Sequence, residues 1–140
     1  MKNGFKVGLV GLLIFLTGCG ATTYEVNGLT SDNSAYLKAD SEHAHGIFVG
    51  LDERLYIHEI NGAAAGDFIK GYPEDAKILA GENVVKVEYW HSQISSNGCV
   101  KFSAEAGNTY IIRKKREGMS VYYWVVKEGS ETPISKSCSV

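Results

Sequence analysis

The residue types best suited to chemistry are the histidines, two of which lie close together in Glu42-His43-Ala-His45. In an extended segment, side chains two positions apart point to the same side, and neutral imidazoles are good ligands for zinc or copper. His43 and His45 are therefore a possible metal site, with surface or turn histidines as the alternative. Two ligands are too few, so a complete site needs others from nearby strands: Asp40, Glu42, His58 or His91.

A second charged feature is the basic run Arg113-Lys114-Lys115-Arg116, which precedes a turn at Glu117-Gly118. Such a run suits contact with an anionic surface, where each Lys or Arg contributes about 1 kcal/mol. The alternative is a solvated hairpin end whose charges discourage edge-to-edge aggregation.

The sequence contains no motif of a nucleophilic enzyme or a metalloprotease: neither Gly-x-Ser-x-Gly nor His-Glu-x-x-His occurs. We therefore expect a protein that is not an enzyme. An aromatic groove for a glycan or peptide is a further possibility, with Tyr122 and Trp124 joined by Tyr89 or Trp90. The alternative is that these aromatic side chains belong to the core.

The N-terminus is typical of a secretion signal. Lys2 and Lys6 precede an uncharged apolar run at 7–16. The run has about ten residues, whereas a membrane-spanning helix needs about 20. It can therefore direct export, but it is too short to remain as a transmembrane anchor.

The sequence Leu16-Thr17-Gly18-Cys19 that follows the run resembles the cleavage box of bacterial prolipoproteins. The resemblance implies that residues 1–18 are a signal peptide and that Cys19 carries lipid on its sulfur. Cys19 then becomes the first residue of the mature chain, and its amino group is acylated as well. Two or three acyl chains make a lasting membrane anchor, which one chain alone does not. Gly20 in place of Asp implies the periplasmic face of the outer membrane.

Once Cys19 is used for lipid, Cys99 and Cys138 remain as an even pair. In an oxidising compartment such a pair is expected to form a disulfide, which would close 39 residues and contribute about 4 kcal/mol. The alternative is two free thiols.

Removal of the signal changes the charge. The chain has 14 basic and 16 acidic residues, and loss of Lys2 and Lys6 leaves 12 against 16, a net charge of −4. A mildly acidic chain lacks the basic face that nucleic-acid binding requires, so we expect no nucleic-acid partner. The residues that remain, 19–140, suffice for one domain with a core.

The mature chain divides into a polar spacer at 19–34 and a single domain at 35–140. Short segments rich in β-branched and aromatic residues, with turn residues between them, predict an all-β fold, specifically a small antiparallel β-sandwich that follows the N-terminal signal helix. Asn97-Gly98, Gly107-Asn108 and Glu117-Gly118 are the expected turns of a four-strand meander from 84 to 127. The expected strands are 35–38, 46–49, 54–60, 76–79, 84–91, 99–104, 109–114 and 121–127.

A weaker resemblance covers about residues 45–127. A strand ending in Asn61-Gly62, a segment ending in Gly81 and an alternating strand ending in Tyr89 are similar to PEGA-type surface β-modules. The following stretch at 102–110 resembles a run in uncharacterised proteobacterial lipoproteins. Both resemblances imply a fold and carry no activity.

These features lead us to expect a membrane-anchored lipoprotein that acts as a non-enzymatic interaction or accessory protein of the cell envelope. Its expected partners are the membrane, through the lipid, and another envelope protein. No cofactor is expected beyond the covalent lipid on Cys19. The alternative is a periplasmic lipoprotein that binds metal through histidines or a glycan through aromatic side chains.

Overall fold

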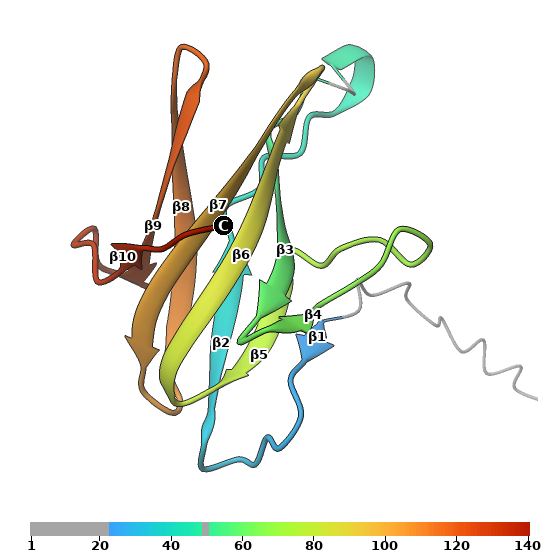
Figure 1. Cartoon of the computed structure of the whole chain (residues 1–140). Helices are drawn as coiled ribbons and strands as arrows, with labels where there is room; N and C mark the ends of the chain where they lie inside the picture. The colour runs from blue at the N-terminus through green and yellow to red at the C-terminus, as the bar shows by residue number, and fades with distance from the viewer. Residues whose placement is uncertain (1–22, 49–50) are drawn as a thin grey trace, which may run out of the picture.

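The computed structural model describes residues 23–48 and 51–140, so the predicted signal peptide and Cys19 lie outside the described residues. Two five-stranded sheets pack face to face (Figure 1). The elements are β1 (Tyr24–Glu25), β2 (Ser34–Ala39), the 3₁₀ turn η1 (Gly46–Phe48), β3 (Arg54–Ile60), β4 (Ala63–Ala64), β5 (Asp75–Leu79), β6 (Gly81–His91), β7 (Ile94–Ala104), β8 (Thr109–Glu117), β9 (Ser120–Lys127) and β10 (Lys136–Ser137).

The strand order is β1-β5-β2-β8-β9 in the first sheet and β10-β7-β6-β3-β4 in the second. Most pairs are antiparallel, although β2 pairs with β8, and β1 with β5, in parallel. The predicted all-β sandwich is therefore confirmed. The predicted continuous meander is wrong: β6–β7 and β8–β9 are hairpins in different sheets, and the chain crosses between the sheets at 105–108.

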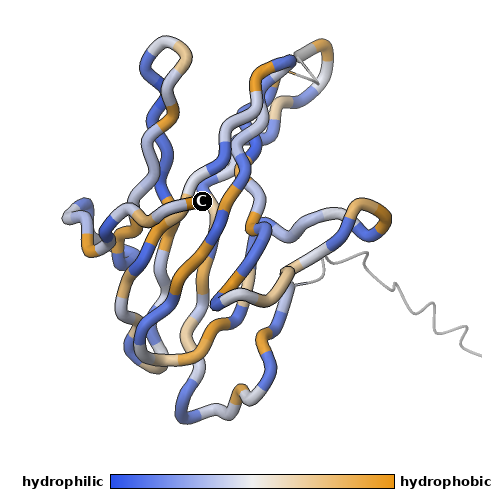
Figure 2. Tube along the Cα trace, viewed as in Figure 1, coloured by the Kyte–Doolittle hydropathy of each residue, from blue (hydrophilic) through white to orange (hydrophobic). Residues whose placement is uncertain are grey.

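The core lies between the sheets and follows the alternation of apolar and polar residues along each strand. Leu37, Ile57, Val87, Ile112 and Val125 point inward and are at most 1% exposed. Figure 2 shows the same alternation as changes between apolar and polar colour along the strands. Full burial of one such side chain stabilises the fold by about 1.5 to 3 kcal/mol, which makes these strands the rigid frame of the domain.

β3 contains a β-bulge, which changes the residues that this strand points toward the core. The pairing of β3 with β6 shifts between Ile57 and Glu59, which leaves His58 as the extra residue. Because of this shift, Ile57 and Ile60 both reach the core although they are three positions apart. The His58 side chain is partly exposed, and its ring stacks on Tyr72 of the loop between β4 and β5.

Asn61-Gly62, at which the sequence predicts the end of a strand, forms a turn that depends on a buried amide. Both residues have positive φ, 52° and 84°, as a two-residue hairpin turn requires. Asn83, which is fully buried, accepts a hydrogen bond from Asn61 Nδ2 at 3.0 Å and donates to the carbonyls of Leu79 and Gly81. This one side chain ties the β3–β4 turn to the β5–β6 turn.

The substitution Asn83→Leu is expected to lower the free energy of unfolding by about 2 kcal/mol, because it leaves buried polar groups without partners. Chemical denaturation followed by circular dichroism measures the loss. The neighbouring Glu82→Gln, at an exposed position, serves as the control and is expected to change stability by less than about 0.5 kcal/mol. Equal stability of the Asn83→Leu variant and the wild type would contradict this role for the amide.

Two predicted boundaries need correction. The described part of the segment predicted as a strand at 46–49 forms η1 (Gly46–Phe48) instead, and Ile47 is 92% exposed because this run has no sheet to pack on. The predicted spacer at 19–34 contains β1, in which Tyr24 pairs with Ala76 of β5. The Lys77 amine also lies 2.6 Å from the Glu25 carboxylate, so the paired structure begins eleven residues earlier than the sequence predicted.

Asn97-Gly98 is not a turn but lies inside β7. The β6–β7 hairpin turns at Ser92 and Gln93 instead, and the two strands stay paired from His91–Ile94 to Gly81–Ala104. Ser92 takes the positive φ, 55°, that this turn needs. The hairpin is therefore longer than the sequence predicted.

The predicted disulfide between Cys99 and Cys138 is confirmed, with the two Cα atoms 5.0 Å apart. The Cys138 N–H donates to the Cys99 carbonyl at 3.1 Å, and β10 pairs with β7 immediately before the bridge. The bridge therefore fastens the C-terminal tail to the edge of the second sheet.

Candidate functional site

A groove of about 710 Å³ opens at the edge of the sandwich where β1 and β3 approach each other. We call it the edge groove. Its lining includes three tyrosines, two basic residues, three acidic residues and a histidine. They are Tyr24, Tyr56, Tyr72, Arg54, Lys70, Glu25, Glu74, Asp75 and His43, together with Thr23, Ala65, Gly66, Gly71 and Pro73.

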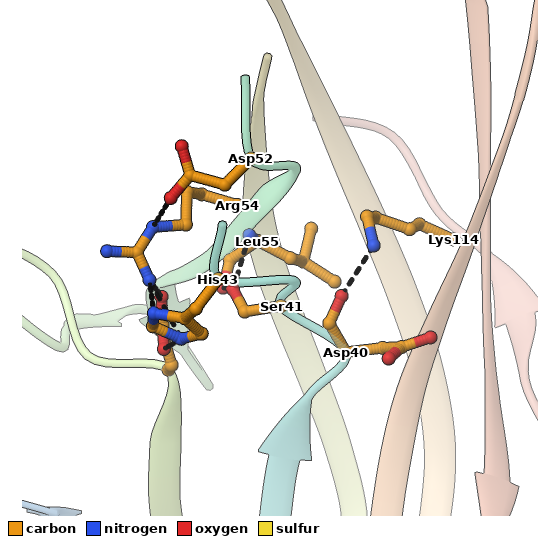
Figure 3. A network of polar contacts seen from close by, with 8 residues as sticks. Asp40, Ser41, His43, Asp52, Arg54, Leu55 and Lys114 are labelled. Atoms are coloured by element: carbon orange, nitrogen blue, oxygen red, sulfur yellow. Dashed lines mark hydrogen bonds and ion pairs between the residues drawn. The ribbon is translucent and has the colours of Figure 1, made fainter. Parts of the chain in front are cut away.

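Arg54, at the start of β3, holds a network of charges at one side of the edge groove. Its Nε lies 3.0 Å from Asp52 Oδ2, and its Nη1 donates to Glu74 Oε1 at 3.1 Å. His43 Nε2 lies 2.9 Å from Glu74 Oε2 and 2.8 Å from Arg54 Nη1. Figure 3 shows the Arg54 guanidinium between Asp52 and His43. The network fixes a guanidinium and a carboxylate in place, ready to orient a polar ligand.

The segment after β2 positions His43 by bridging the two sheets. Asp40 N–H donates to the Ile112 carbonyl of β8, while the Ser41 hydroxyl contacts both the N–H and the carbonyl of Leu55 in β3. The Lys114 amine donates to the Asp40 carbonyl at 2.7 Å, and its side chain is only 3% exposed. Figure 3 shows this chain of contacts from Lys114 through Asp40 and Ser41 to Leu55.

The basic run 113–116 does not form an open cationic patch. Its side chains alternate between the two faces of β8, and each cation lies within 4 Å of a carboxylate, so its field is largely neutralised. The predicted contact with an anionic surface therefore finds no supporting geometry. The pairs are Arg113 with Asp40 (3.3 Å), Lys114 with Glu42 (3.6 Å), Lys115 with Glu117 (2.6 Å) and Arg116 with Glu53 (3.9 Å).

The histidines are not gathered into one site. His43 is engaged by Arg54, whereas His45 is exposed beside η1. His58 stacks on Tyr72 with ring centroids 3.6 Å apart, and its Nε2 lies 2.7 Å from Glu88. Within residues 23–48 and 51–140, no group of three or more potential ligands is placed to hold a metal ion.

The aromatic residues proposed for a glycan groove do not meet. Tyr89 is fully buried in the core, and burial is the main cause that raises its pKa to about 12. Trp90 points outward from the second sheet, while Tyr122 and Trp124 alternate with the core-facing Tyr123 and point outward from the first. These side chains lie on opposite outer faces and cannot share one groove.

The tyrosines of the edge groove were missed at the sequence level. Tyr24 lay in the segment predicted to be a spacer, and Tyr72 lies in the loop between β4 and β5. The Ile57 N–H donates to the Pro73 carbonyl, which docks this loop beside the bulge of β3. No spacing in the sequence reports such a contact between a loop and a strand edge.

Asp75, also in the groove, carries a carboxyl whose pKa is raised first by burial and further by Glu74, against the opposing effect of Lys38. A raised pKa means that folding favours the protonated acid, so stability is lost as the pH rises above the unfolded value of 3.8. The variant Asp75→Asn is therefore expected to have a higher Tm than the wild type at pH 7.

This gain should vanish near pH 3, where Asp75 is protonated in both folded and unfolded wild-type chains. Scanning calorimetry from pH 3 to pH 7 measures it. The exposed Asp32→Asn provides the matched control and should show no such pH-dependent gain. A lower Tm for Asp75→Asn than for the wild type at pH 7 would contradict the raised pKa of Asp75 in the folded protein.

The chain matches no known family model, and no curated protein or solved structure is significantly similar to it. In the described part of the chain, no helix is long and apolar enough to cross a membrane.

Proposed function

We propose that this protein is a lipid-anchored, non-enzymatic component of a bacterial cell envelope, attached through Cys19 to the periplasmic face of the outer membrane. The observation that carries the proposal is the Cys99–Cys138 disulfide, which accounts for two of the three cysteines in the sequence and leaves Cys19 as the third. Disulfides persist mainly in oxidising compartments outside the cytosol, so the bridge supports the export that the N-terminal signal predicts.

The proposed task is to bind another envelope protein in the edge groove. Tyrosine and arginine are favoured at protein interfaces because they combine large contact areas with hydrogen bonding. Here Tyr24, Tyr56 and Tyr72 line the same groove as the Arg54 guanidinium, which Asp52 and Glu74 hold in place. An extended segment of a partner, with polar side chains spaced along it, suits such an open and mixed surface.

A binding role is favoured over catalysis by the pairing of the polar side chains. In the ranges that the structure describes, no serine or threonine hydroxyl is hydrogen-bonded to a histidine, and the Ser41 hydroxyl is committed to the backbone of Leu55. His43 faces an arginine and a carboxylate, which suits a fixed charge network.

Site-specific photocrosslinking in cells tests the proposed task. The photoreactive analogue benzoylphenylalanine replaces Tyr24 in the edge groove or, as the control, Tyr122, which is 53% exposed on an outer face. We expect a crosslink to one envelope protein from position 24 and none to that protein from position 122. The crosslink should weaken when Arg54→Gln is added, because the groove then loses the guanidinium that Asp52 and Glu74 hold in place.

Equal capture of the same protein from both positions, or no capture from position 24, would contradict the groove as the binding site. Because stability could also change, circular dichroism of the Arg54→Gln variant must first show a folded protein.

A periplasmic glycan binder is the second candidate, and the observation that favours it is the set of three tyrosines in the groove. Aromatic faces and fixed charges suit a sugar with an ionised group. Titration calorimetry of the wild type and the Tyr72→Ala variant with soluble cell-wall fragments separates the two functions. Binding that Tyr72→Ala abolishes would support the glycan, whereas no heat from the wild type would exclude it.

A further inference from the structure

The loop between β4 and β5 carries the most exposed pair of large apolar side chains in the described residues. Phe68 is 98% exposed and Ile69 is 93% exposed. Figure 2 shows this loop projecting from the side of the sandwich, with apolar colour at its tip. We call these two residues the loop tip. Neither side chain contributes to the core, so their exposure needs another explanation.

The loop is held in shape by its own hydrogen bonds. Asp67 Oδ1 accepts from the N–H groups of Ile69 at 2.9 Å and Lys70 at 2.7 Å, and the Gly71 N–H donates to the Asp67 carbonyl. The Lys70 N–H is the main cause that holds the pKa of Asp67 below its usual range. A β-carbon on Gly66 would lie 2.2 Å from the Gly71 carbonyl oxygen, so the base of the loop is closed tightly. The tip is therefore presented in a fixed conformation.

The loop also lies next to the point where the anchored N-terminus joins the domain. Thr23 and Tyr24 line the edge groove together with Gly66 and Lys70. Figure 1 shows β1 on the same side of the molecule as the β4–β5 loop. Cys19 precedes Thr23 by four residues, and a fully extended chain of that length spans at most about 14 Å. A lipid on Cys19 therefore keeps this side of the domain close to the membrane.

We propose that the Phe68–Ile69 loop tip inserts into the lipid interface beside the lipidated Cys19, as a second membrane contact that fixes the orientation of the domain. Phe68 and Ile69 would enter the boundary between headgroups and acyl chains, and the Lys70 amine would face anionic headgroups. This inference rests on the proposed lipid anchor. It adds that the domain rests on the membrane through the β4–β5 loop and does not swing freely on a tether.

Fluorescence quenching in vesicles tests the insertion. The full lipidated protein carrying Ile69→Trp is reconstituted into vesicles of phosphatidylethanolamine and phosphatidylglycerol with brominated acyl chains, which quench tryptophan on contact. The control is Met119→Trp, at an 87% exposed apolar position in the β8–β9 turn, far from the loop tip in Figure 1. The wild type gives the background of Trp90 and Trp124.

We expect the tryptophan added at position 69 to lose emission in brominated vesicles, relative to unbrominated ones, while the tryptophan added at position 119 does not. Intact mass spectrometry of the same samples reports whether lipid is attached to Cys19. Lipidated protein whose added tryptophan at 69 is not quenched overturns the insertion and leaves the proposed anchor standing. A mature mass without lipid overturns the anchor and, with it, this inference.

Discussion

Replacing Cys138 with serine is expected to lower the free energy of unfolding by about 4 kcal/mol, because the bridge to Cys99 closes 39 residues and limits the unfolded chain. The difference in free energy of unfolding between the wild type and the variant should appear only under conditions in which the wild-type bridge is intact. Urea denaturation with and without a reducing agent measures it, and reduced wild type should resemble the variant.

The variant should also release the tail from the sheet. β10 is only two residues long, so it has few hydrogen bonds of its own to hold it against β7. Hydrogen exchange of the amide groups at 136–138 should therefore rise in Cys138→Ser, whereas the buried strand β6 stays protected. Unchanged stability and unchanged exchange in the variant would show that the bridge does not constrain this domain.

The second large effect is expected at Gly98, where Gly98→Ala should lower the free energy of unfolding by about 3 kcal/mol. A β-carbon at this position would lie 2.2 Å from Cδ2 of the Tyr123 ring. The ring has little freedom to move, because the Tyr123 hydroxyl donates to the Ser96 carbonyl at 2.9 Å. The substitution therefore pushes β7 and β9 apart at the side where the two sheets meet.

A double-mutant cycle separates this clash from any general effect of alanine in a strand. Gly98→Ala should cost much less when Tyr123 is already alanine, since the ring that collides is gone. The exposed Asn97→Ala is the control for a neighbouring change. An equal cost of Gly98→Ala in both backgrounds would contradict the close approach as its cause.

The parts of the fold that followed from the sequence are those governed by local patterns. Alternation of Val85, Val87 and Tyr89 with charged residues correctly predicted a strand with one buried face. The pair Glu117-Gly118 correctly predicted the turn between β8 and β9, where Gly118 has a positive φ of 63°. The disulfide followed from counting cysteines after one was assigned to lipid.

The parts of the fold that were predicted wrongly depend on contacts between segments that are distant in the sequence. Asn97-Gly98 has the composition of a turn, yet Gly98 lies in a strand, where it pairs with Val87. Glycine is needed there because the ring of Tyr123 from the other sheet leaves no room for a side chain. The crossing between β7 and β8 has turn residues at Gly107-Asn108 that also suit a hairpin, so local composition could not tell the two apart.

The candidate site was largely beyond sequence reasoning for the same reason. His43 was recognised as a chemically capable side chain, but its partners Arg54 and Glu74 come from β3 and from the loop before β5. The basic run 113–116 was interpreted as one cationic patch, whereas pairing with Asp40 and Glu53 from two other segments and with Glu117 of β8 itself divides and neutralises it. Such pairings are set by the packing of the two sheets.

The most direct test of the proposed anchor is the intact mass of the protein purified from the membrane fraction of cells that express the full chain, beside a Cys19→Ala variant. We predict a mature wild-type chain that begins at Cys19 and carries covalent acyl chains, while the Cys19→Ala chain carries none and keeps residues 1–18. A wild-type chain cleaved at another position, or one that begins at Cys19 without lipid, would contradict the proposal.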